Sequence, residues 1–76
     1  MTYGVVFLHN TYGVLRAEKL LIKAGHKVKL IPPPREYSSD CGIALRFDWN
    51  EYEQVKTALT PLNDDVVKIQ NVPGLT

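Results

Sequence analysis

Hydrophobic and polar positions alternate along this chain with two different periods, and the period changes several times. Short runs rich in β-branched and aromatic residues indicate strands, whereas apolar residues that recur three or four positions apart indicate helices. The strands are expected at residues 5–8, 27–31, 43–47 and 66–69. One amphipathic helix is expected between the first two strands, and another between the last two.

The first helix has start and stop signals in the sequence. Asn10 or Thr11 can cap its N-terminus, because their side chains accept hydrogen bonds from the free backbone N–H groups of the first turn. Gly25 is expected to end it, since glycine adopts the left-handed conformation at low cost. Its apolar residues recur at helical spacing: Val14, Ala17, Leu21 and Ala24.

The second helix begins with the spacing of a capping box. Asp48 would cap its N-terminus, and Glu51 follows three residues later. Pro61 and Asn63 mark its end. Its apolar face is expected to hold Tyr52, Val55, Leu59 and Leu62.

The order of these elements is βαββαβ, which predicts an α+β domain of the ferredoxin-like type. We expect a four-stranded antiparallel sheet in the order 4-1-3-2, with two helices on one face. Residues 1–76 would form a single domain, in which residues 70–76 are a short C-terminal tail.

Composition narrows the possible functions. The chain has 76 residues, 22% of them charged, and a net charge of +1, which argues against a general polyanion binder. The first residues lack the basic start of a signal peptide, so none is expected, and no apolar run approaches membrane-spanning length. The single cysteine forms no internal disulfide and no cysteine-rich zinc site, so we expect the cytoplasm as compartment and neither a metal nor a cofactor.

That cysteine, Cys41, ends a segment that is too long to be a simple hairpin connection, which usually takes about two to five residues. In the predicted topology the end of the first strand and the start of the third meet at one edge of the sheet, so His9 and Asn10 are expected near Cys41. The N-terminus of the first helix and Arg35 favour a thiolate there, whereas Asp40 opposes it. Gly42 would leave a backbone N–H open to an anion.

The segment from Pro32 to Phe47, with its Pro-Arg-Glu, Ser-Ser, Cys-Gly and Ala-Leu-Arg pattern, closely resembles the family of selenium/sulfur carrier-like proteins. The resemblance implies that Cys41 accepts sulfur or selenium as a persulfide or selenosulfide, surrounded by Arg35, Ser38, Ser39 and Gly42. It implies a non-catalytic carrier that acts with a cysteine desulfurase-type or selenium-donor enzyme and with an acceptor enzyme.

Three further expectations concern the sheet and the long connection between its second and third predicted strands. The strand at 5–8 is apolar on both faces, which predicts a homodimer or an enzyme contact through the face that the helices leave open. Lys27, Lys29, Arg46 and Lys68 suggest RNA binding on that face, although the third strand lacks paired aromatic residues there. In the remaining alternative, a regulatory module binds a small ligand or anion through the backbone of the long connection.

Overall fold

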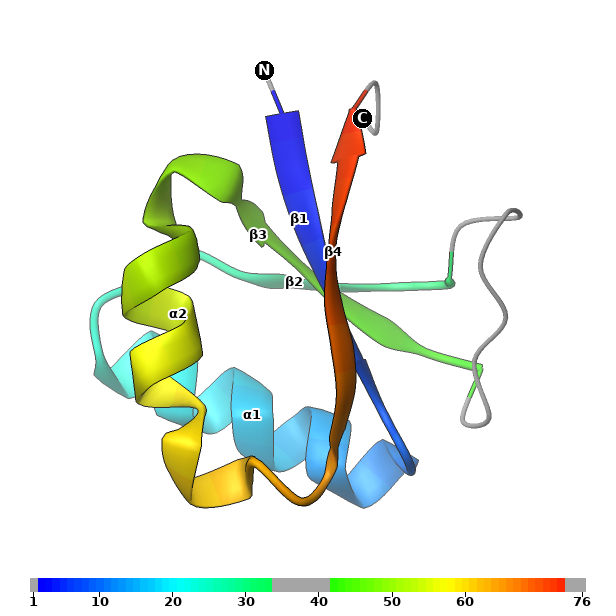
Figure 1. Ribbon diagram of the computed structural model, residues 1–76. Coiled ribbons are helices and arrows are strands. Elements are labelled where there is room, and N and C mark those ends of the chain that lie inside the picture. The colour runs from blue at the N-terminus through cyan, green and yellow to red at the C-terminus, as the bar shows by residue number, and fades with distance from the viewer. Residues whose placement is uncertain (1, 34–41, 74–76) are drawn as a thin grey trace.

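The computed structural model describes residues 2–33 and 42–73, which form an α+β fold (Figure 1). The strands are Thr2–Leu8 (β1), Lys29–Ile31 (β2), Ala44–Asp48 (β3) and Val66–Pro73 (β4). The helices are Thr11–Lys23 (α1) and Tyr52–Ala58 (α2). Two short 3₁₀ helices, Trp49–Glu51 (η1) and Thr60–Leu62 (η2), flank α2.

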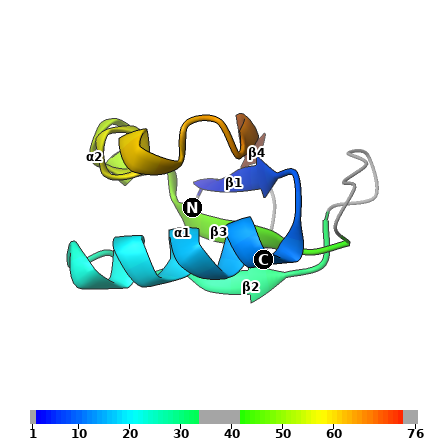
Figure 2. The ribbon, with the colours of Figure 1, turned by 90° about the horizontal axis from the view of Figure 1, so that it is seen from below.

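All strand pairs are antiparallel, and the strands lie in the order β2-β3-β1-β4. Counted from the opposite edge this is 4-1-3-2, and Figure 2 shows the strands one above the other in that sequence. The prediction of an α+β domain with a four-stranded antiparallel sheet and two helices is confirmed.

Both helices pack against the same face of the sheet. Val6 and Leu8 of β1 and Leu45 and Phe47 of β3 point to this face and are buried. The helical side of the core consists of Val14, Ala17 and Leu21 from α1 and of Val55, Leu59 and Leu62 from α2 and the residues after it. The predicted apolar faces are therefore correct, except that Ala24 is the exposed C-cap of α1.

The ends of α1 follow the sequence signals. The side-chain Oδ1 of Asn10 accepts a hydrogen bond from the backbone N–H of Gly13 at 2.7 Å. At the other end Gly25 has a φ of 92°, and the N–H of His26 donates to the carbonyl of Leu21 at 2.9 Å. This 6→1 bond beside a left-handed glycine is a Schellman stop.

The second helix and the last strand differ from the prediction. The helical segment after Asp48 is divided into η1, α2 and η2. Asp48 Oδ1 accepts from the N–H of Asn50 at 3.0 Å, but Glu51 pairs with His26 rather than completing a capping box. The β4 strand extends to Pro73, so residues 70–73 are part of the sheet and not of a tail.

The face of the sheet away from the helices, the open face, has a small apolar cluster of its own. Val5, Phe7 and Ala44 are at most 1% exposed in the single chain, with Ile31 and Val72 packed against them. The apolar residues of β1 are thus covered without a second copy of the chain. Dimerisation through this face remains a prediction.

Candidate functional site

The connection that contains Cys41 joins two strands that pair directly. Ile31 is opposite Ala44 in the β2–β3 ladder, so residues 32–43 form the connection. This is far longer than the two to five residues of an ordinary hairpin loop. Cys41 lies outside the described residues, as do three of its predicted neighbours: Arg35, Ser38 and Ser39. The described part of the predicted site consists of Gly42, His9 and Asn10.

Gly42 directly follows Cys41 and has a left-handed backbone, with a φ of 69°. It is exposed, and a Cβ added to it would meet no atom within 4 Å. The requirement for glycine is therefore conformational rather than steric, since other L-residues are strained at this φ. Its N–H has no hydrogen-bond partner among residues 2–33 and 42–73.

His9 and Asn10 are held at the start of α1. The N–H of His9 donates to the carbonyl of Asp65 at 3.0 Å, and the side chain of Asn10 caps α1. β1 separates from β3 after the pair Val6–Leu45 but stays paired with β4 as far as Leu8. Neither residue forms a hydrogen bond with Gly42. Asn10 thus has a structural role, and a contact of either residue with Cys41 remains a prediction.

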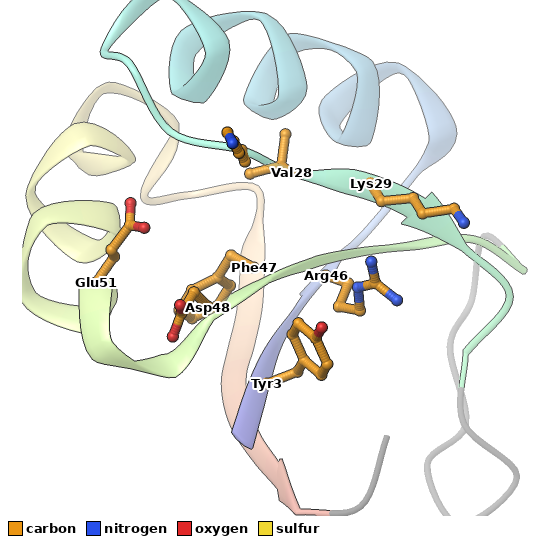
Figure 3. Close-up of a pocket in the computed structure, with 8 residues that line it drawn as sticks. Tyr3, Val28, Lys29, Arg46, Phe47, Asp48 and Glu51 are labelled. Atoms are coloured by element: carbon orange, nitrogen blue, oxygen red, sulfur yellow. The ribbon is translucent and has the colours of Figure 1, made fainter. Parts of the chain in front are cut away.

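A second feature is a hollow of about 270 Å³ beside β1, β2 and β3, which we call the basic hollow (Figure 3). The guanidinium of Arg46 lies 4.4 Å from the centre of the Tyr3 ring. Lys29 extends on the same side of the sheet as these two residues. The complete lining is Tyr3, Lys27, Val28, Lys29, Arg46, Phe47, Asp48 and Glu51.

Two carboxylates at the other end of the hollow already have partners. Asp48 accepts the hydrogen bond from Asn50, and Glu51 pairs with Nδ1 of His26. The side chain of His26 is only 12% exposed. His26 follows the turn that ends α1, and its pairing with Glu51 could not be predicted from the sequence, because no short motif joins residues 25 positions apart.

Comparison with models of protein families gives one match. Residues 3–70 match the family described as "Putative Se/S carrier protein-like". The chain belongs to this family. Comparison with curated proteins and with solved structures gives no match.

The family match covers both candidate regions of this selenium/sulfur carrier-like protein. It includes Cys41 and Gly42 as well as the strands that line the basic hollow. No described helix is long and apolar enough to span a membrane. In the described ranges, no group of three or more His, Cys, Asp or Glu residues is placed to hold a metal ion.

Proposed function

We propose that the protein is a carrier of sulfur or selenium, with Cys41 as the atom-bearing residue. The observation that carries the proposal is the family match over residues 3–70, which includes the only cysteine of the chain. A lone cysteine suits the task, because a second thiol nearby would attack the inner, Cys41 sulfur of the persulfide, form a disulfide with it and expel the carried atom as hydrosulfide. A reducing compartment such as the cytoplasm would keep this thiol free.

Loading is a thiol exchange that needs no added oxidant. The Cys41 thiolate attacks the outer sulfur of a persulfide on a donor enzyme of the cysteine desulfurase type. The S–S bond of the donor breaks, its electron pair stays on the donor thiolate, and a persulfide forms on Cys41. A nucleophile of the acceptor enzyme then takes the outer sulfur and releases the Cys41 thiolate. With selenium the product on Cys41 is a selenosulfide, and the electron balance is the same.

The surroundings of Cys41 are proposed to hold the anionic persulfide. Gly42 supports this role, since it is exposed, its N–H has no partner in the described ranges, and it adjoins Cys41 in sequence. Arg35 would add a positive charge, and Ser38 and Ser39 would donate hydrogen bonds. His9 is exposed directly after the end of β1, and we propose that its ring also contributes to these surroundings.

RNA binding receives less support. An RNA-binding sheet of this topology stacks bases on exposed aromatic side chains. Phe7, on the open face of β1, is 1% exposed. The ring of Tyr3 has the guanidinium of Arg46 over it. In the described part of the chain, the two aromatic residues of β1 on the open face are thus not free to receive bases.

The test is persulfide transfer to the intact protein. A purified cysteine desulfurase and cysteine are incubated with the wild type and with Cys41→Ser, and intact masses are measured without reductant. We expect the wild type to gain the mass of one sulfur atom and Cys41→Ser to gain none. Lys19→Gln, a change on the exposed side of α1, is the matched control and should load like the wild type.

The alkylation rate of Cys41 with iodoacetamide provides the second measurement. A carrier thiol should react in the native protein at a rate that does not depend on unfolding. A reaction that occurs only as fast as global unfolding, with no sulfur gained from the desulfurase, would place the thiol in the interior and refute the proposal.

A further inference from the structure

We propose that the basic hollow binds a small phosphate-like oxyanion through Lys27, Lys29 and Arg46. The hollow is lined by residues of β1, β2 and β3 and by the segments that adjoin them. This site contains none of the residues assigned to sulfur transfer, so it goes beyond the carrier function. The two proposals can fail independently.

The strand register brings two positive side chains together. Lys29 of β2 is directly opposite Arg46 of β3, so two positive side chains share one face of the sheet. Like charges directly opposite on neighbouring strands are destabilising. The arrangement does not stabilise the free protein, whereas an anion between the two cations would turn the repulsion into attraction.

Protection of the sheet edge explains only part of the arrangement. β2 is an edge strand, and lysines on edge strands discourage pairing with other chains. Arg46, however, lies on β3, which is paired on both sides. Its guanidinium is held over the Tyr3 ring at 4.4 Å, which orients a rigid fork of N–H donors. Such a fork matches the oxygens of a phosphate group.

These cations have no carboxylate partner, although two carboxylates line the same hollow. None of Lys27, Lys29 and Arg46 forms an ion pair with a carboxylate in the described parts of the chain. The hollow also contains Asp48 and Glu51, but Asp48 caps η1 and Glu51 pairs with His26. Figure 3 shows Glu51 at the end of the hollow away from Lys29 and Arg46, with Asp48 between Glu51 and Tyr3.

The size of the hollow indicates a small molecule rather than a polymer. Its volume of about 270 Å³ is near the lower limit of small-molecule sites. Val28 and Phe47 supply apolar wall beside the charged groups. The chemistry therefore fits one phosphate or diphosphate group with little attached to it.

The test is a titration of the full-length protein with sodium pyrophosphate, with inorganic phosphate and sodium chloride as comparisons, followed by ¹⁵N–¹H NMR. We expect saturable shifts of the backbone signals of residues 27–29 and 46–48 with pyrophosphate. Arg46→Gln and Lys29→Gln should each weaken binding about tenfold, the effect of losing one hydrogen bond to a charged group. Lys19→Gln on α1 should bind like the wild type.

Folding is checked by the melting temperature of each variant. Lys29→Gln should melt no lower than the wild type, because it removes the repulsion with Arg46. Equal affinity of Arg46→Gln and the wild type would overturn the proposal. The proposal would also be overturned if the shifts did not saturate up to about 10 mM pyrophosphate, a concentration above the dissociation constants of weak specific complexes. Saturable binding of a single-stranded RNA that pyrophosphate does not displace would also overturn it, in favour of a nucleic-acid surface.

Discussion

Gly4 of β1 lies against two aromatic rings, those of Phe47 and Trp49, and replacing it by alanine tests how tightly these rings are packed. A Cβ at this position would lie 2.3 Å from Cζ of Phe47 and 2.7 Å from Cε3 of Trp49. Carbon atoms in contact are normally about 3.5–4.0 Å apart. The rings would have to move by about 1 Å, and Phe47 lines the hollow.

The rings have little room to move. Phe47 is 2% exposed and stacks on Trp49, which stacks on Tyr52 with ring centres 4.6 Å apart. Overpacking of this kind costs about 1–3 kcal/mol. The backbone of Gly4 does not have a positive φ, so alanine can adopt it. Without the clash, alanine would stabilise the protein by about 0.4–1 kcal/mol, because it lowers the conformational entropy of the unfolded chain. The clash is the larger effect, and we expect a net loss of about 1–2 kcal/mol.

The assay is urea unfolding followed by circular dichroism, together with thermal melting. For a domain of this size the loss corresponds to a decrease of about 5–15 °C in Tm. Phe47→Leu should cost less in the Gly4→Ala background than in the wild type, with a coupling of at least about 0.5 kcal/mol. An unchanged or increased stability of Gly4→Ala would refute the reasoning, because it would show that the rings yield without cost.

Three further changes test the local structure around the candidate sites. Asn10→Ala should lower the free energy of unfolding by about 1 kcal/mol, and Asn10→Ser should lower it by much less, because serine also caps helices. Equal losses for the two variants in urea unfolding would contradict the capping role. His26→Ala and Glu51→Gln should be non-additive by about 0.5–1 kcal/mol in a double-mutant cycle, and strict additivity would show that their contact contributes nothing. Gly42→Ala should cost about 1–2 kcal/mol because of its φ of 69°, and Gly42→Asn clearly less; a neutral Gly42→Ala in thermal melting would mean that the left-handed turn after Cys41 relaxes freely.

The strands and the first helix were predictable because their signals are local. Leu45 and Phe47 alternate with Arg46 along β3 and lie on the helix-covered face, and Asn10 and Gly25 marked the ends of α1. The extension of β4 was not predictable, since asparagine and proline are poor strand formers. An edge position tolerates them, because Asn71 and Pro73 there need to pair with β1 on one side only.

The parts of the sites that were missed depend on contacts between distant segments. The sequence showed that Lys29 and Arg46 would face the same side, but not that Tyr3 lies under the guanidinium. It also gave no sign that the carboxylate of Glu51 is occupied by His26. Both contacts arise only when the start of β1 and the turn after α1 meet the end of β3.

The hydrophobic core explains why the two cations stay opposite each other. Leu30 is opposite Leu45, which is fully buried beneath the helices. Full burial of a leucine side chain stabilises by about 1.5–3 kcal/mol, and both Leu30 and Val28 are partly buried against the core, whereas repulsion across a sheet costs at most about 1 kcal/mol. A slip of one residue would separate Lys29 from Arg46 only by turning Leu30 out of the core. The larger energy therefore fixes the register, and the free protein keeps a repulsion that a bound anion can relieve.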